Sequence, residues 1–396
     1  MILQTVPRTA MPSETPLLPV DHENALLIGR IHDPRDEGPS VVAIKAGGLF
    51  DLTRQCPTVS QLLESDDIAA LVSAAREATQ WSLDTVLRNT LAHDQATARF
   101  VAPCDLQVIK ACGVTFAGSM LERVIEEKAA GNPQEAARIR ENIGKVIGHA
   151  ISNIRPGSEE ALQAREYLIQ EGLWSQYLEV GIGPDAEVFT KAPVLSAVGS
   201  GEAIGILKAS QWNNPEPELV LAVNSRGRIC GATLGNDVNL RDIEGRSALL
   251  LGKAKDNNAS CAIGPFIRLF DEGFTLDDAR GLEISLNVSG RDGFVLDGHS
   301  SISRISRDLA DLVAQTCGRH HQYPDGFMLF TGTLFAPTED RDDPGQGFTH
   351  KMGDVVRISS PRLGSLVNPV THSEEAPPWT RGITHLMRNL AGRGLL

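Results

Sequence analysis

Two glutamates lie on either side of a proline at the start of an apolar run. Glu216 and Glu218 flank Pro217 in "NNPEPELVLAV", a run typical of a buried strand. Because side chains alternate along a strand and proline is tolerated at its first residues, both carboxylates should share one face at the strand end. Their like charges favour a divalent cation between them. By spacing alone, solvated acids at the mouth of a strand are the commoner explanation.

A third carboxylate strengthens the prediction of a metal site. Asp237 ends the next apolar run, and the turn "NSRG" at 224–227 should fold the chain back so that this strand end meets the first. Three carboxylates without a histidine or cysteine favour Mg²⁺, with Mn²⁺ as an alternative, over zinc.

Five sequence blocks, in this order, resemble the fumarylacetoacetate hydrolase superfamily: "EPELVLAV", "GNDVNLRD", "KAKDNNASCAIGPF", "TGT" and "KMGDVVRISSPRLGSLVNPV". The resemblance implies an α+β fold, in which a β-rich catalytic domain of coiled mixed sheets, a β-roll, follows a small α+β N-terminal domain. It also implies that Glu216, Glu218 and Asp237 bind the metal.

The same resemblance assigns further residues by their positions. It implies that Lys255 contacts a bound keto acid and that Thr333 of "TGT" holds the substrate carboxylate, while Thr331 is structural. Arg241 falls where members have an arginine close to the metal, and it is expected to contact the substrate. Lys191 matches a lysine near the pocket, although a lysine on a surface loop would explain that position equally well.

The run "GVTFAGSMLE" departs from the pattern of the hydrolases in this superfamily. These commonly show G-x-N-Y-x-x-H-x-x-E, whose histidine and glutamate activate water for attack on a carbonyl. Here Thr115-Phe116 replace Asn-Tyr and Ser119 replaces the histidine, whereas Glu122 is kept. Hydrolysis of a carbon–carbon bond would lack its usual base, and Ser119 is left as a substrate contact.

Other blocks resemble the superfamily branch of 2-keto-3-deoxy-pentonate dehydratases: "GLWSQYLEVGIGPDAEVFTK", "SQWNNPEPE" and "NLAGRGLL". The branch implies Mg²⁺-dependent conversion of 2-keto-3-deoxy-D-pentonate, of the D-xylonate or D-arabinonate series, to 2,5-dioxopentanoate in non-phosphorylating pentose catabolism. A metal on the keto acid acidifies the C3 protons. Our hypothesis is that Lys255 takes a C3 proton and Glu122 protonates the departing hydroxyl, although these two roles could be reversed.

Two other functions stay open at this point. A metal-dependent acylpyruvate-type hydrolase would cleave a 2,4-diketo-3-deoxy sugar acid to pyruvate and a hydroxy acid, using Glu122 and a metal-bound water. A non-catalytic sugar-acid binding protein would keep the metal pocket for sensing, but it would not need Glu122 or Lys255.

The elements that must position these residues fall into regions of different character. Residues 1–20 contain four prolines and no periodicity, which predicts a flexible arm. Residues 21–102 predict the small N-terminal domain, and 103–396 the catalytic domain, with a helical lid or insert at about 117–176. From residue 186 onward, short β-rich runs are spaced like an antiparallel, coiled sheet.

Composition excludes several classes of protein. The 396 residues contain 37 Lys and Arg against 50 Asp and Glu, a formal charge of −13 without a basic block, which disfavours nucleic-acid binding. Six scattered cysteines predict neither a zinc site nor disulfides, and no apolar run predicts secretion or membrane spanning. We expect a cytoplasmic protein whose partner is a small 2-keto acid, and the resemblance implies a homodimer or homotetramer.

Overall fold

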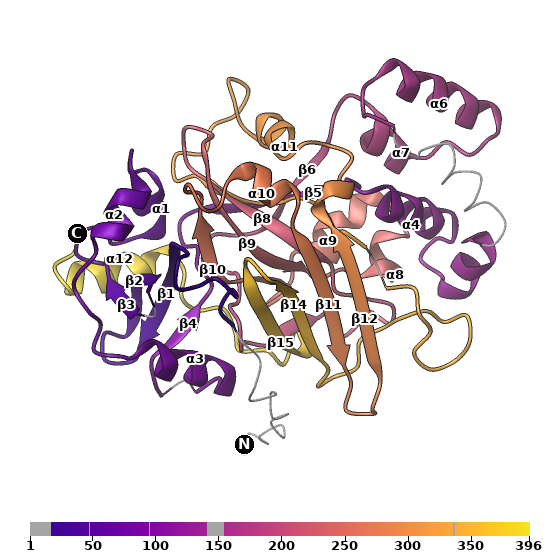
Figure 1. Cartoon of the computed structure of the whole chain (residues 1–396). Helices are drawn as coiled ribbons and strands as arrows, with labels where there is room; N and C mark the ends of the chain where they lie inside the picture. The colour runs from indigo at the N-terminus through magenta and orange to yellow at the C-terminus, as the bar shows by residue number, and fades with distance from the viewer. Residues whose placement is uncertain (1–16, 47, 95, 141–153, 336) are drawn as a thin grey trace.

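A ten-stranded sheet forms the centre of the fold (Figure 1) in this computed structural model, which describes residues 17–46, 48–94, 96–140, 154–335 and 337–396. Nine of its strands follow one another in a continuous order, and β4 (Arg99–Val101) pairs with β1 outside that order. In that order, the strands are β3 (Gly48–Asp51), β2 (Gly38–Lys45), β1 (Leu27–Asp33), β10 (Cys261–Leu269), β9 (Ile229–Asp237), β8 (Pro217–Val223), β13 (Phe327–Phe330), β5 (Val108–Gly113) and β6 (Glu187–Ala192).

A second sheet of five strands packs beside the first and shares its largest apolar core. Burial alternates along its strand β11, because one face meets this core and the other faces solvent. Both sheets are mixed, since β13–β5 and β15–β7 are parallel pairs among antiparallel ones. The α+β class is confirmed. The strand order is β12 (Val295–Ser301), β11 (Glu283–Ser289), β14 (Val355–Ser360), β15 (Gly364–His372) and β7 (Ile204–Ile206).

The N-terminal strands continue the large sheet of the catalytic region. β1 pairs with β10 through Leu27 opposite Arg268, and the Phe266 ring of β10 meets Phe100 of β4 edge to face at 4.9 Å. The predicted division at 102/103 therefore crosses a shared sheet, and it stays a prediction. Leu17, inside the predicted arm, is buried, whereas residues 1–16 lie outside the described part.

Short helices surround the sheets, and several begin at a side chain that accepts a hydrogen bond from the first turn, such as Ser82 and Ser158. The described part of the predicted lid is largely helical and lies at one end of the molecule (Figure 1), while 141–153 are outside the described residues. The helices are α1 (Val59–Leu63), α2 (Ile68–Ala74), α3 (Leu83–Ala92), α4 (Ala117–Lys128), 133–140, α6 (Glu159–Gln170), α7 (Gln176–Ile182), α8 (Arg241–Glu244), α9 (Leu251–Lys255), α10 (Leu276–Arg280), α11 (Leu309–Thr316) and α12 (Ile383–Gly392).

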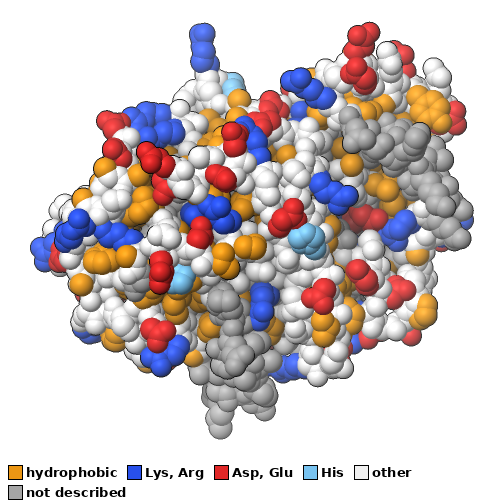
Figure 2. Space-filling view, viewed as in Figure 1, with side chains coloured by type: hydrophobic (Ala, Val, Ile, Leu, Met, Phe, Trp, Pro, Cys, Tyr) orange, Lys and Arg blue, Asp and Glu red, His pale blue; other side chains and the backbone are white. Residues whose placement is uncertain are grey.

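The surface in Figure 2 carries acidic and basic side chains interspersed over most of the face shown. Within the described residues, every helix is too short or too polar to cross a bilayer.

Replacing Phe266 by alanine tests whether the N-terminal strands share one core with the rest. Phe266 is 1% exposed, so Phe266→Ala should lower the free energy of unfolding by about 3–5 kcal/mol through the lost contact and the cavity left behind. Denaturant unfolding would measure this change. The control Leu249→Ala, at a side chain 95% exposed, should stay within about 0.5 kcal/mol of the wild type. Equal effects of the two substitutions would contradict a shared core.

Candidate active site

The hairpin of β8 and β9 brings the three predicted metal ligands together. Pro217 begins β8 opposite Asn236, and the carbonyl of Glu216 accepts a 3.1 Å hydrogen bond from the backbone N–H of Asp237. At the other end, Gly227 N–H donates to Asn224 in the expected turn. The predicted hairpin is confirmed, and its register sets Asp237 beside the two glutamates.

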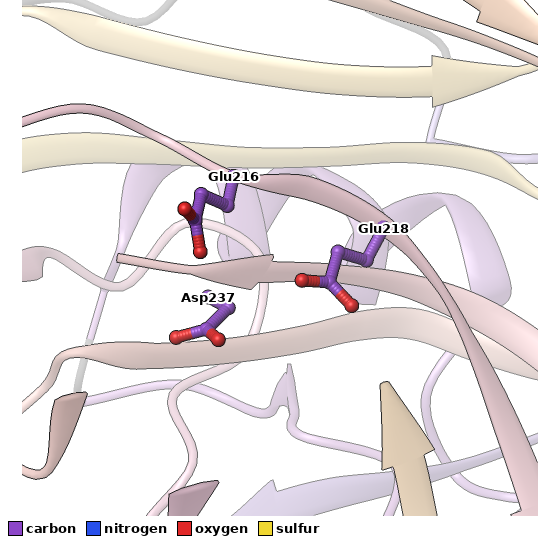
Figure 3. A group of neighbouring side chains, drawn as sticks. All are labelled: Glu216, Glu218 and Asp237. Carbon is purple, nitrogen blue, oxygen red and sulfur yellow. The ribbon is translucent and has the colours of Figure 1, made fainter. Parts of the chain in front are cut away.

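The three carboxylates converge in a buried space. Figure 3 shows Glu216, Glu218 and Asp237 turned toward one another, and one oxygen from each lies within 4.8 Å of the others. All three side chains are at most 2% exposed. An oxygen-only donor set of this size fits a hard divalent cation such as Mg²⁺, which would be held by these three residues.

Burial and neighbouring charges shift the pKa values of the three acids in different directions. Burial, followed by the charges of Asp237 and Glu216, raises the pKa of Glu218 well above its ordinary value. Burial also raises the pKa of Glu216. Burial opposes ionisation of Asp237 as well, but the neighbouring Lys191 and Lys255 outweigh it and lower its pKa.

Two buried lysines contact these acids. Lys255 donates to Glu216 and, at 3.1 Å, to Asp237, while Lys191 forms a 2.8 Å ion pair with Asp237. Lys191 is fully buried, so the description of a surface lysine is wrong. The charges of Asp237 and Glu216 overcome burial and raise the pKa of Lys255. Without a cation between the acids, Lys255 is therefore held as an ammonium. Its expected role as the base beside a bound metal stays a prediction.

Arg123 is a site residue that the sequence analysis missed. It pairs with Glu126 at 2.6 Å and Glu244 at 3.0 Å, and it also contacts Glu216. Arg123 follows Ser119 by four residues on α4, and both are buried. A basic residue on the apolar face of a predicted helix was the available signal.

Glu187 is the second residue that was missed, and it lines the same pocket. Burial, reinforced by the charge of Glu244, raises the pKa of Glu187 to about 7. A Cβ atom at position 113 would lie 1.9 Å from Glu187 Oε2, so Gly113 provides the space for this carboxyl group. Glu187 is the first residue of β6, and Glu216 directly precedes β8. An acid at the start of a strand was therefore the available signal in both places.

The charges around the metal ligands are unequal among the described residues. Six carboxylates face four basic groups, which leaves two negative charges in excess when every group is ionised. A divalent cation would balance that excess. The acids are Glu126, Glu187, Glu216, Glu218, Asp237 and Glu244, and the basic residues are Arg123, Lys191, Arg241 and Lys255.

The loop after β13 completes the pocket. Gly332 N–H donates to Glu218 at 2.7 Å, and Gly332 has a φ of +102°; a Cβ atom there would lie 1.9 Å from Thr115 Oγ1. Only glycine suits this position. Thr331 donates to the carbonyl of Leu219 and is structural, as expected, whereas Thr333 lines the pocket.

The pocket is small and contains no imidazole. Ser119 lines it, and its hydroxyl donates to the carbonyl of Phe116 at 3.0 Å. The cavity volume is only 20 Å³, about enough for one water molecule. None of the described residues that line it is a histidine: Cys112, Gly113, Val114, Ser119, Arg123, Glu187, Phe189, Glu216, Glu218, Asp237, Glu244, Lys255 and Thr333.

The structure places two predicted site residues outside this lining. Glu122 is paired with Arg140 through bonds of 2.9 and 2.5 Å, because a turn of the next helix offers a guanidinium to it. Arg241 pairs with Glu126 at 3.1 Å and donates to the carbonyl of Pro337, so it contacts the pocket residues only through Glu126 and Arg123. Neither Glu122 nor Arg241 is among the described lining residues, and their expected roles toward the substrate stay predictions.

Glu218→Gln tests the metal site by two effects of opposite sign. The change removes a buried like charge and keeps an oxygen for Gly332, so the melting temperature of metal-free protein should equal or exceed that of the wild type. The affinity for Mn²⁺ should fall by at least about tenfold, since a direct ligand is lost. Melting curves with and without Mn²⁺ would measure both effects.

The matched control for this experiment is Glu272→Gln, because Glu272 is an exposed acid. It should leave the stabilisation by Mn²⁺ unchanged. Equal stabilisation of Glu218→Gln and the wild type by Mn²⁺ would show that Glu218 is not a ligand.

Comparisons with known proteins agree with this geometry. A family model described as fumarylacetoacetate (FAA) hydrolase C-terminal matches residues 179–371. A "Probable 2-keto-3-deoxyxylonate dehydratase" of Haloferax volcanii is 36% identical over 210 residues, 53% of this chain and 68% of that protein. A "2-dehydro-3-deoxy-D-arabinonate dehydratase" of Saccharolobus solfataricus is 33% identical over 184 residues, 46% of this chain and 58% of that protein, less than two thirds of its length.

A solved structure shows the same fold. It is described as 2-keto-3-deoxy-D-arabinonate dehydratase complexed with magnesium and 2,5-dioxopentanoate, and it matches with a TM-score of 0.59 and 22% identity over 87% of this chain and 99% of that one. The family model, the 36% identity over 68% of the first relative and the hairpin that carries three carboxylates agree with one another. This chain therefore belongs to the fumarylacetoacetate hydrolase family.

Proposed function

We propose that this protein is a metal-dependent hydro-lyase that converts 2-keto-3-deoxy-D-pentonate to 2,5-dioxopentanoate. The observation that carries the proposal is the buried carboxylate triad beside Lys255 and Glu187, in a pocket whose described lining has no imidazole. The names of the two curated relatives, both dehydratases, support the same reaction class. Mg²⁺ is the proposed cofactor, with Mn²⁺ as a substitute.

The pocket residues divide into two groups by their chemistry. A divalent ion bound by Glu216, Glu218 and Asp237 would act as a Lewis acid toward the carboxylate and keto oxygens of the substrate. Thr333, at the pocket wall, donates its hydroxyl proton to the carbonyl of Phe335 at 3.0 Å, and this hydroxyl would turn to the substrate carboxylate. The remaining work is the movement of protons, for which the pocket offers Glu187 and Lys255.

Glu187 and Lys255 suit opposite proton transfers. Glu187, with a pKa of about 7, is partly ionised near neutrality and can accept a C3 proton. Lys255 donates hydrogen bonds to two carboxylates, so it holds a proton that can pass to the departing C4 hydroxyl. This assignment replaces Glu122 by Glu187 and exchanges the role that we first gave to Lys255.

The proposed reaction balances without another reactant. Loss of the C3 proton and the C4 hydroxyl as water leaves a 3,4-unsaturated 2-keto acid with a hydroxyl at C5. Removal of a proton from C5 and protonation at C3 give the enol of the C5 aldehyde, which tautomerises to 2,5-dioxopentanoate.

Product analysis tests the reaction class. With Mg²⁺, 2-keto-3-deoxy-D-pentonate should yield 2,5-dioxopentanoate; EDTA should stop turnover, and added Mg²⁺ should restore it. The same protein should not cleave a 2,4-diketo-3-deoxypentonate. Formation of pyruvate from the diketo acid, without any 2,5-dioxopentanoate from the keto-deoxy acid, would establish the hydrolase instead. Binding of either acid without conversion would establish a binding protein.

Glu187→Gln tests the proposed base. It should lower kcat by about 10²- to 10⁴-fold and stop exchange of the C3 protons with D₂O, which NMR measures. In the wild type, kcat should fall as the pH drops through about 7, because the ionised carboxylate is the active form, and this inflection should be absent from the variant. The control Glu179→Gln, at a half-exposed acid on α7, should keep both exchange and turnover.

Lys255→Ala tests the proposed acid. It should stop the release of water while slow C3 exchange continues, and Mn²⁺ binding measured in parallel would show whether the site is intact. If C3 exchange is lost in Lys255→Ala and kept in Glu187→Gln, the two roles are reversed.

A further inference from the structure

A second cavity, of 270 Å³, shares no lining residue with the carboxylate pocket. Its walls come from β1 and β4 of the N-terminal strands, from the loop at 195–203, and from the segment at 377–386 that leads into α12. The cavity therefore lies between the N-terminal strands and the segment that leads into α12, and the proposed reaction does not use it.

The lining of this cavity is basic, although the whole chain carries a formal charge of −13. Glu202 is the one acid among the described lining residues. Six lining residues carry a guanidinium or an imidazole: Arg30, His32, His93, Arg99, Arg381 and His385. This local reversal of charge is typical of a site that attracts an anion.

Several of these groups are buried without an acceptor among the described residues. Arg99 is 5% exposed, and its Nε and Nη1 atoms have no hydrogen-bond partner. Its Nη2 atom lies 4.0 Å from Glu202. Neither ring nitrogen of His32, also 5% exposed, has a partner. Arg30 differs, because it donates to the carbonyls of Ala102 and Cys104. Buried donors are nearly always paired in proteins, so those of Arg99 and His32 indicate a missing acceptor.

The pKa of His32 agrees with a basic cavity that lacks an acceptor for this side chain. Burial and the charges of Arg381 and Arg99 lower the pKa of His32 to about 4, even though Asp33 acts in the opposite direction. Asp33 itself accepts bonds from Arg35 and Trp81, and it does not line the cavity.

We propose that this cavity binds a small organic anion, with a carboxylate directed at Arg99 and His32. Val101, Leu195 and Trp379 offer apolar contact to a short aliphatic skeleton, which inorganic phosphate would not use. Because 270 Å³ is slightly below the range of typical ligand sites, about 300–1,000 Å³, a compact mono- or dicarboxylate fits and a nucleotide does not.

Titration of full-length protein with glutarate tests this site. EDTA-treated protein is used, so that no metal in the carboxylate pocket can chelate the ligand. Trp379 at the cavity mouth, 46% exposed, should report binding by a saturable change in fluorescence. Calorimetry should give one site per chain, weaker binding of inorganic phosphate, and no binding of the neutral glutaramide at equal ionic strength.

Two variants and two controls locate the site. Arg99→Gln should weaken glutarate binding at least tenfold. His385→Ala should also weaken it, and because His385 is a half-buried residue on α12, this change should leave the strands folded. Arg88→Gln, at an exposed arginine of α3, and Glu216→Gln, in the other pocket, should leave binding unchanged.

Four results would overturn the proposal. Three of them are no saturable binding of glutarate, equal binding of glutarate by wild type and by both Arg99→Gln and His385→Ala, and loss of binding in Glu216→Gln. Binding of phosphate as tight as that of glutarate would also contradict it, because it would reduce the site to a charge without an aliphatic contact.

Discussion

Three carboxylates buried at one end of a hairpin form the constraint on which the rest of the active site depends. Glu216, Glu218 and Asp237 repel one another in a region that excludes water, so the fold must supply positive charge nearby. Lys255 and Lys191 supply part of it directly, and Arg123 does so from α4. A divalent cation would balance the excess of negative charge that remains when all of these groups are ionised.

The same constraint explains why residues from distant parts of the chain meet here. Glu187 reaches the pocket because β6 pairs with β5, and β5 lies next to β13, the strand that leads to Thr333. Glycines at positions 113 and 332 leave room for Glu187 and Thr115. The chemistry of the site therefore depends on strand order as much as on the identity of the ligands.

The sequence predicted the ligands because their arrangement is local. Glu216, Glu218 and Asp237 sit on one hairpin, whose turn and alternation can be read from consecutive residues. Glu187 and Arg123 were missed because a parallel strand pair and the packing of α4 bring them in. The pairing of Glu122 with Arg140 could not be predicted, because the sequence does not show that the next helix packs back against α4. The basic cavity had no local signal in the sequence, because its lining combines residues of the N-terminal strands with the segment at 377–386.

The attachment of Arg123 to Glu216 links the lid to the metal ligands. A cavity of 20 Å³ is too small for a sugar acid, so binding requires side chains of the lining, Arg123 among them, to change position. A cation held at Glu216 would compete with Arg123 for the same carboxylate, which ties the environment of this arginine to the occupancy of the pocket.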